Sequence, residues 1–282
     1  MQTAVAVEPV RSSSSVSSRV ASNLFIDFFR NIVQYREYLK QSVARDLRRR
    51  YKRSVLGYIW SMLNPLLMMT ILAIVFSNIM RHSVHDYAVF LFSGMLTWTY
   101  FSSTSQGCLG TIRANARIME QVPVPKYIFP LSVGFSGLVD LLLSFVPLLL
   151  VMIVVGHDIP VTIFAVPLVL LPLFCITMGI SLICAVSNVF FEDTQHLVEV
   201  IFRAVYYLCP VLYTREHLPQ WLVKWASLNP MFGLIEMMRG LIYDGQLPDA
   251  EKYFTNFGGC LVVLMIGLWI FRRADRKFIY FL

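Results

Sequence analysis

Charged residues are scarce in this chain of 282 residues. Asp, Glu, Lys and Arg together make up 15% of it, whereas they make up about 25% of an ordinary soluble domain. Hydrophobic residues make up 57%, and the mean hydropathy is +0.63. This composition excludes a soluble globular domain. Because only helices and closed barrels can satisfy their backbone in lipid, the long uncharged runs described below predict an all-α integral membrane protein.

Two motifs of catalytic or nucleotide-binding chains are absent. The sequence has neither G-x-x-x-x-G-K-[ST], the loop that cradles ATP phosphates, nor the zinc-protease motif H-E-x-x-H. Any ATP and magnesium that the protein depends on must therefore be bound by a partner subunit. An intramembrane protease that uses Ser181 as its nucleophile would need a histidine base in another span, but the five histidines lie in links or at the ends of apolar runs. We expect no catalytic residue and no metal site in this chain.

Cysteines are few and lack any paired spacing. The five cysteines, an odd number without C-x-x-C, fall in or beside apolar runs and are predicted to be small buried hydrophobic residues. The N-terminal 22 residues have no apolar core of the kind found in a signal peptide and are rich in serine. They predict a disordered cytoplasmic tail.

Apolar runs divide the rest of the chain into six predicted membrane spans. A helix rises 1.5 Å per residue and the hydrocarbon core is about 30 Å thick, so about 20 apolar residues suffice to cross it. Pro160, Pro167 and Pro172 predict that the fourth span begins late or is kinked near its outer end. The six predicted spans are residues 55–80, 87–112, 129–156, 161–190, 197–214 and 254–271.

The distribution of Lys and Arg predicts the topology. Of the 24 cations, 18 fall before the first span, in the second-to-third link or after the sixth span, five fall on the opposite side, and Arg203 lies within a span. Because Lys and Arg are retained in the cytoplasm, both termini are predicted to be cytoplasmic. The net charge of +7 comes from cations that flank spans and form no basic face, so nucleic-acid binding is not predicted.

The start of the first span carries a recognisable motif. Cations crowd before it, and the sequence then reads Arg-Tyr-x-x-Ser-x-Leu-Gly-x-x-Trp-x-x-x-x-Pro from Arg50 to Pro65. This pattern resembles the start of the first membrane helix in ABC-2 type permeases, the membrane subunits of bacterial O-antigen, capsule, teichoic acid and galactan exporters. We expect a cytoplasmic entrance and interface made by Arg48, Arg50, Tyr51, Lys52, Arg53 and Trp60.

The resemblance implies a function and partners. It implies a homodimer joined to two copies of a separate ABC ATPase subunit, with spans one, two and five lining a path. Such a complex would use ATP to move lipid-linked polysaccharide from the cytoplasmic side across the bacterial inner (cytoplasmic) membrane. The alternatives are an ABC-2 exporter of a drug or lipid, an intramembrane enzyme and a non-catalytic scaffold.

Three polar segments receive roles from the resemblance. Residues 23–54 predict an amphipathic interface helix followed by a basic segment, although an ordinary partner-facing helix fits the same pattern. Residues 113–125 resemble the coupling helix that docks on the ATPase, and the candidate residues there are Arg113, Asn115, Arg117 and Glu120. Residues 215–253 predict short re-entrant or extracytoplasmic gate helices, with candidate residues Asn229, Pro230 and Arg239.

Two sets of side chains fall near the middle of predicted spans. The charged residues Asp140, Glu199 and Arg203 favour structural pairing, an aqueous cavity or snorkelling to the interface. Asp140 and Arg203 could pair across two helices, but Glu199 is the nearer partner for Arg203 because it lies four residues before it. Aromatic residues in spans two and five are too deep to be interfacial anchors, so they either line the substrate path or pack in the core. These aromatic residues are Trp98, Tyr100, Phe101, Tyr206 and Tyr207.

Overall fold

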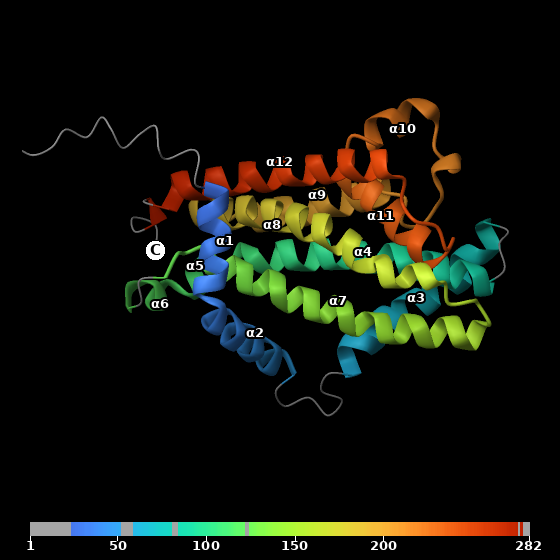
Figure 1. Cartoon of the computed structure of the whole chain (residues 1–282), viewed down its shortest axis with the longest axis horizontal. Helices are drawn as coiled ribbons and strands as arrows, with labels where there is room; N and C mark the ends of the chain where they lie inside the picture. The colour runs from blue at the N-terminus through green and yellow to red at the C-terminus, as the bar shows by residue number, and fades with distance from the viewer. Residues whose placement is uncertain (1–23, 52–58, 81–83, 122–123, 276, 279–282) are drawn as a thin grey trace, which may run out of the picture.

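The computed structural model describes residues 24–51, 59–80, 84–121, 124–275 and 277–278, and within them the secondary structure is helical, without strands. The long helices run side by side along the long axis of the molecule (Figure 1). The elements in chain order are α1 (Leu24–Gln34), α2 (Arg36–Tyr51), α3 (Ile59–Met80), α4 (Val84–Leu109), α5 (Thr111–Ala114), α6 (Ala116–Gln121), α7 (Ile128–Val155), the 3-10 helix η1 (Val161–Ala165), α8 (Val166–Phe190), α9 (Thr194–Leu208), the 3-10 helix η2 (Arg215–His217), α10 (Gln220–Ala226), α11 (Pro230–Ile242) and α12 (Ala250–Asp275).

Three helical segments of the described chain are long and apolar enough to cross a membrane. They are Ile128–Val155, Val161–Phe190 and Ala250–Asp275. Helix α4 has sufficient length, but hydroxyl groups in its second half lower its hydropathy. Helix α9 has 15 residues and would extend only about 22 Å, which is short of the roughly 30 Å of a hydrocarbon core.

Helix α8 lies at the centre of the bundle. In its most apolar window 72% of the residues are buried inside the protein, against 22% for α7 and 28% for α12. It contacts α12 at very close range. Gly179 of α8 and Gly267 of α12 have no side chains, so the two backbones can meet. On another face of α8 the buried hydroxyl of Ser181 donates to the hydroxyl of Ser105 on α4, 3.3 Å away. Ser181 is therefore a helix-contact residue.

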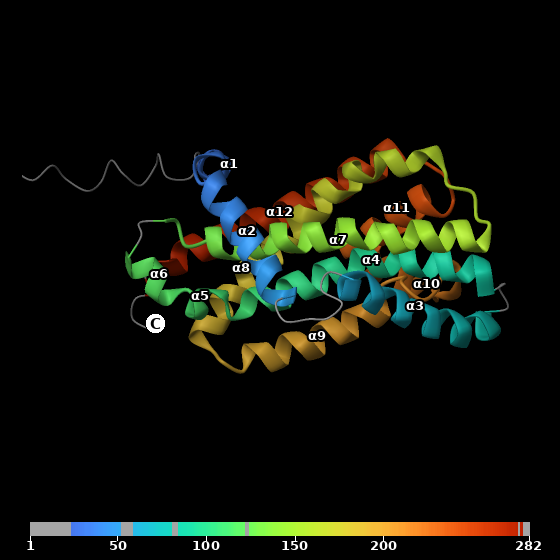
Figure 2. The same cartoon turned by 90° about the horizontal axis from the view of Figure 1, so that it is seen from below.

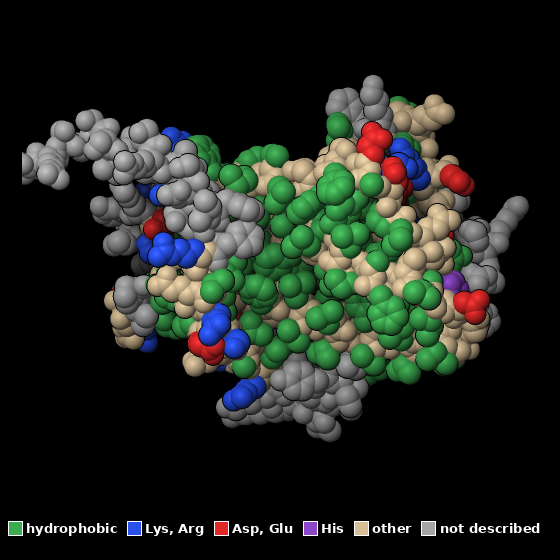
Figure 3. Space-filling model, in the orientation of Figure 1, with side chains coloured by type: hydrophobic (Ala, Val, Ile, Leu, Met, Phe, Trp, Pro, Cys, Tyr) green, Lys and Arg blue, Asp and Glu red, His purple; other side chains and the backbone are tan. Residues whose placement is uncertain are grey.

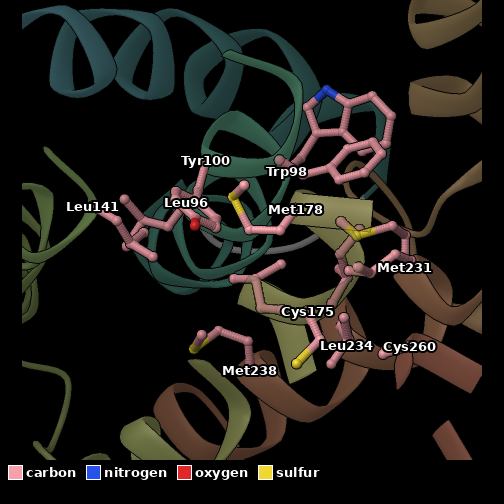
Figure 4. Packing of buried hydrophobic residues seen from close by; sticks show 14 of the residues in the cluster. Leu96, Trp98, Tyr100, Leu141, Cys175, Met178, Met231, Leu234, Met238 and Cys260 are labelled. Carbon is pink, nitrogen blue, oxygen red and sulfur yellow. The ribbon is translucent and has the colours of Figure 1, made fainter. Parts of the chain in front are cut away.

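The core around α8 brings together small, soft and aromatic side chains from four other helices. Figure 4 shows Cys175 and Met178 of α8 among side chains from α4, α7, α11 and α12. All five cysteines are buried and free, which confirms their predicted role as small hydrophobic residues. A packed core of this kind positions α4 and α11, which carry the candidate residues Trp98, Tyr100, Phe101, Pro230 and Arg239.

The polar segments gather at the two ends of the bundle. Helices α1, α5 and α6 and the C-terminal end of α12 lie at one end, and α10 and α11 lie toward the other (Figures 1 and 2). Hydrophobic side chains dominate the middle of the face in Figure 3, whereas the charged ones are concentrated toward its ends. This distribution matches a helical bundle that exposes its middle to lipid and its ends to water.

Helix ends differ from the predicted span ends where proline and asparagine intervene. The predicted fifth span runs to residue 214, but α9 ends at Leu208, because Cys209 precedes Pro210 and takes an extended conformation with ψ of 146°. The predicted coupling helix 113–125 is instead two short helices, α5 and α6, and begins two residues earlier. Asn115 separates them, since its side-chain amide donates to the Thr111 carbonyl at 2.8 Å and so closes α5.

The N-terminal segment is divided in the same way. The predicted helix within 23–54 is two helices, α1 and α2, that meet at Tyr35. Helix α1 crosses the end of the bundle (Figure 1), where the ring of Phe28 packs against the ring of Tyr127 at 5.6 Å. The amide of Asn31 donates to the Tyr127 hydroxyl at 2.6 Å. One face of α1 is therefore bound to the bundle, and the opposite face, which includes Val33, is exposed.

Candidate functional site

Aromatic side chains join α4 to α9 near the middle of the bundle. The ring of Trp98 lies 5.5 Å from the ring of Tyr206 and 6.4 Å from the ring of Phe202. Phe101 stacks on Phe202 with 5.2 Å between the ring centroids. Each such pair contributes about 0.5–1.5 kcal/mol beyond the burial of its area, so this cluster stabilises the packing of α9 on α4.

The structure divides the five predicted path aromatics into two kinds. Trp98, Tyr100 and Phe101 are buried, and the Tyr100 hydroxyl points away from α9 to the Gly134 carbonyl of α7 at 3.4 Å. Tyr206 is half-buried, whereas Tyr207 is 61% exposed. Only the tyrosines of α9 are therefore accessible from outside the single chain.

The accessible side of α4 is polar instead of aromatic. Thr99, Ser103 and Gln106 are exposed and lie four and three residues apart, which places them on one helix face. A small cavity of about 50 Å³ opens beside them, between α4 and α7, and Asp140 and Ser144 also line it. Uncharged polar groups are unfavourable toward lipid, so this face requires water or protein opposite it.

The charged pair on α9 is exposed as well. Arg203 donates to Glu199 at 2.9 Å, one helical turn away, and their side chains are 70% and 55% exposed. Glu199, the nearer of the two partners predicted for Arg203, is thus its partner in the structure. Two exposed charges on a helix with apolar neighbours again indicate a face that is not turned to lipid in the assembled protein.

Arg239 occupies a buried position between α4, α11 and the turn after α9. Its guanidinium donates to the carbonyls of Pro210 at 2.7 Å and Val211 at 3.1 Å, and its Cζ lies 3.6 Å from the centroid of the Phe90 ring. The residue is 6% exposed, and burial lowers the pKa of Arg239 to about 10, so it remains charged at neutral pH. Gly94 leaves the space that the guanidinium occupies.

We call Arg239, Tyr87 and the carbonyls that they bind the Arg239 clamp. The Tyr87 hydroxyl donates to the Leu212 carbonyl at 2.6 Å, so three successive carbonyls, those of residues 210, 211 and 212, are bound from α4 or α11. Asn229 caps α11, since its side-chain oxygen accepts from the Met231 amide at 3.0 Å, and Pro230 begins the helix. The three predicted gate residues therefore build and anchor one helix, α11.

The predicted ATPase-coupling residues fall on two different surfaces. Arg117 and Glu120 are exposed on α6. Arg113 is instead turned to the bundle, where it pairs with Glu192 and donates to the Val189 carbonyl at 3.1 Å. The side-chain amide of Asn115 donates to the Thr111 carbonyl of α5. Only Arg117 and Glu120 of the four are thus free to contact a partner protein.

Part of the predicted cytoplasmic entrance lies outside the described residues. This applies to Lys52 and Arg53, and also to the side chains of Arg50 and Tyr51, which end α2. Arg48 is exposed near the end of α2, and Trp60 is 48% exposed at the start of α3.

Several residues of these sites were not singled out from the sequence. Phe202 precedes Tyr206 by one helical turn, and this spacing could have indicated that both contact Trp98. Glu192 is an acidic residue in a link on the same predicted side as Arg113, which is a weak signal for pairing. Phe90, Gly94 and Tyr87 carry no sequence signal for Arg239, because an apolar span predicts no particular neighbour.

Parallel apolar helices with polar segments at both ends define an α-helical integral membrane protein. The chain belongs to the ABC-2 type transporter family, whose model matches residues 37–243. The O-antigen export system permease protein RfbA of Myxococcus xanthus is 31% identical over 258 residues, which cover 90% of this chain and 98% of the relative.

Two further relatives belong to the same group of transport proteins. The O-antigen export system permease protein RfbA of Klebsiella pneumoniae is 31% identical over 237 residues, or 83% of this chain and 90% of the relative. The polysialic acid transport protein KpsM of Escherichia coli is 26% identical over 238 residues, or 82% of this chain and 91% of the relative. The identification as an ABC-2 type permease from the motif at Arg50–Pro65 is confirmed.

The division of the aromatic residues gives a test by substitution with leucine, which keeps apolar volume. We expect Trp98→Leu to lower the thermal stability of the purified protein, because it removes three ring contacts in a buried cluster, those with Phe101, Phe202 and Tyr206. Tyr207→Leu should lower stability less, because the exposed Tyr207 ring contacts only the ring of Tyr206, at 5.3 Å. We expect it to reduce transport, because a sugar stacked on this ring would lose on the order of 1 kcal/mol, as bases do on aromatic rings. Normal transport by a stable Tyr206→Leu/Tyr207→Leu variant would exclude these tyrosines from the path.

Proposed function

We propose that this chain is the transmembrane subunit of an ATP-driven ABC exporter that moves lipid-linked polysaccharide across the bacterial inner membrane. The observation that carries the proposal is the 31% identity, over 90% of the chain, with a protein named as an O-antigen export permease. The KpsM relative is named for polysialic acid transport, so a carbohydrate polymer is common to both groups of relatives. A lipid or drug substrate is the alternative within the family.

The exposed faces of α4 and α9 support a homodimer with a polar path. On α4 the exposed residues Thr99, Ser103 and Gln106 carry hydroxyl and amide groups, and on α9 the Arg203–Glu199 pair is exposed. Apolar side chains on α9, such as Val200 at 66% and Leu197 at 60%, are exposed beside them. A second copy that covers the apolar strip and encloses the polar one would satisfy both faces.

We further propose six spans with both termini in the cytoplasm. Helices α3, α4, α7 and α12 and the combined η1 and α8 supply five of them. The sixth consists of α9 together with residues 209–214, which extend its 15 residues toward the far side. The strongly basic ends before α3 and after α12 favour this orientation, and they place α10 and α11 as extracytoplasmic gate helices.

This topology predicts labelling with an impermeant thiol reagent. Single cysteines are introduced at Pro248, Arg117 and Asp193 in a background whose five buried native cysteines are replaced. In intact cells only the cysteine at 248 should react, whereas all three should react after the membrane is permeabilised. Labelling of residue 117 from outside in intact cells would contradict the six-span arrangement.

Helix α6 is the proposed contact with the ATPase. It lies at the same end of the bundle as α1 and the C-terminal end of α12 (Figure 1), and Arg117 and Glu120 are exposed on it. The chain has no phosphate-binding loop of its own, so hydrolysis must be transmitted through a contact of this kind. ATP and magnesium would be bound by the partner subunit.

Replacing Arg117 and Glu120 together by alanine tests this contact. We expect the ATPase subunit to co-purify less, or its hydrolysis to become uncoupled from export, by about tenfold, because exposed polar groups at a protein interface mainly set specificity and association. Membrane insertion should be unchanged, as measured by expression level. A matched variant at exposed Lys277 should behave like the wild type. Full coupling in the double variant would place the contact elsewhere.

Deletion of the gene tests the proposed substrate. The expected result is loss of surface polysaccharide with intracellular accumulation of the lipid-linked polymer, restored by the wild-type gene. Unchanged surface polysaccharide together with greater sensitivity to a drug would favour the alternative.

A further inference from the structure

Helix α9 is attached differently at its two ends. Within the described protein it packs mainly against α4 and α8, and Figure 2 shows it at the margin of the bundle. Its outward face is exposed over most of its length. What holds each end therefore decides how the helix can move.

The end of α9 that is followed by Pro210 is held by buried groups. Arg239 binds the carbonyls of Pro210 and Val211, and Tyr87 binds the carbonyl of Leu212. Arg239 and Tyr87 are 6% and 3% exposed, so opening this clamp would leave a charge and several carbonyls unpaired away from water. This end is fixed.

The other end of α9 is held by the buried side chains of Thr194 and Val198 and by one accessible ion pair. Glu192 lies in the turn between α8 and α9, and it pairs with Arg113 of α5. The side chain of Glu192 is 78% exposed, and that of Arg113 is 35% exposed. Ion pairs at this exposure stabilise weakly and exchange readily with water, so this link can open at little cost.

Arg113 is also bound to the last turn of α8, independently of Glu192. Arg113 donates to the Val189 carbonyl in the last turn of α8, where a cation is favoured by the helix dipole, and Asn188 donates to the Leu109 carbonyl at 2.9 Å. Arg113 therefore remains seated on the end of α8 whether or not Glu192 is bound. Within the described residues, the contact with Glu192 connects it to the turn that leads into α9.

Arg113 is joined through Asn115 to the proposed ATPase contact. Asn115 closes α5 with its side chain, and its carbonyl accepts from the amides of Ile118 and Met119 in α6 at 3.0 and 3.1 Å. A displacement of α6 is thus passed through one residue to α5. From α5 the guanidinium of Arg113 reaches the α8–α9 turn.

We propose that Arg113 and Glu192 form a releasable link through which the segment α5–α6 sets the position of the cytoplasmic end of α9, while the Arg239 clamp acts as its pivot. The inference rests on the proposed function. Arg113 is in this view a positioning residue that acts through Glu192, and Arg117 and Glu120 are the groups that meet the ATPase. The path beside α9 opens or closes as the link breaks or forms.

The test is a charge-reversal cycle in the complete exporter complex. The variants are Arg113→Glu, Glu192→Arg and the exchanged pair Arg113→Glu/Glu192→Arg. Each single reversal should lower export per ATP hydrolysed by about fivefold, the factor that corresponds to roughly 1 kcal/mol for an exposed pair. The exchanged pair should recover the part of the loss that comes from the ion pair, but not all of it, because the carboxylate introduced by Arg113→Glu cannot donate to the Val189 carbonyl. Asp193, the exposed neighbour of Glu192, supplies the control, because Arg113→Glu/Asp193→Arg should not recover it.

A second readout distinguishes a link from a merely structural role. A nitroxide label at exposed Gln195, at the start of α9, should become more mobile in each single variant and should be less mobile in the exchanged pair than in either single variant. Co-purification of the ATPase should be unchanged throughout, whereas loss of co-purification in the single variants would mean that Arg113 contacts the ATPase directly and would overturn the proposal. Equal loss in the exchanged pair and the single variants would overturn it too. If the wild-type chain binds no ATPase, the proposed function fails instead.

Discussion

Replacing Gly179 by alanine should prevent α8 and α12 from packing and sharply reduce the amount of folded protein. A β-carbon at this position would lie 2.6 Å from the Val263 carbonyl oxygen and 2.8 Å from the Leu264 amide nitrogen. Both are backbone atoms of α12, so no side chain can rotate away and the helices must separate. Overpacking usually costs 1–3 kcal/mol, and we expect at least about 3 kcal/mol here because the central helix is displaced.

The measurement is the melting temperature of the purified protein, together with its yield after size-exclusion chromatography. Gly267→Ala should have a similar effect, since its β-carbon would meet the backbone of Gly179 from the opposite side. Gly258→Ala is the matched control in α12, because no atom lies within 4 Å of its added carbon. That control should be neutral or slightly stabilising. A Gly179→Ala protein as stable as the Gly258→Ala protein would contradict the close packing of α8 on α12.

Replacing Arg239 by methionine should give the second large effect. Methionine keeps much of the side-chain volume but leaves the carbonyls of Pro210 and Val211 without donors in a buried site. Each unpaired carbonyl costs about 1–3 kcal/mol, so we expect a loss of about 2–6 kcal/mol for the two. Lysine should recover only part of it, because an ammonium cannot stack flat on the Phe90 ring as the guanidinium does.

Thermal unfolding of the same purified variants measures this effect. Arg215→Met is the control, since Arg215 is half-exposed and its nearest acidic atom, on Glu236, is 4.0 Å away. It should change stability by no more than about 0.5 kcal/mol. Gly94→Ala offers an independent test, because its β-carbon would lie 2.9 Å from the Arg239 guanidinium and displace it. Wild-type stability in both Arg239→Met and Gly94→Ala would rule out the buried clamp.

The sequence by itself determined the class of protein and the ends of its long helices to within a few residues, except at the end of α9 and in the divided segments α1–α2 and α5–α6. Long uncharged runs and the crowding of Lys and Arg before α3 and after α12 are local properties, so they can be read without knowing which helices touch. The motif from Arg50 to Pro65 identified the family for the same reason. The prolines at 160, 167 and 172 also predicted the late start of α8, where η1 covers Val161–Ala165 before α8 begins at Val166.

Only the tertiary structure decided which side of each helix is buried and which charged groups meet. In soluble helices a polar face marks the outside, but membrane helices are apolar on nearly all sides, so the buried face leaves little trace in the sequence. Trp98 and Thr99 are neighbours in the same hydroxyl-rich stretch, yet the first is buried against α9 and the second is exposed.

The long-range pairs followed from packing in the same way. Arg113 meets Glu192, 79 residues away, and Arg239 meets backbone carbonyls 28 and 29 residues before it. A backbone carbonyl has no sequence signature at all, because every residue carries one. The close packing of α8 on α12 and the course of α4 bring these groups together, and the functional arrangement at both ends of α9 depends on that packing.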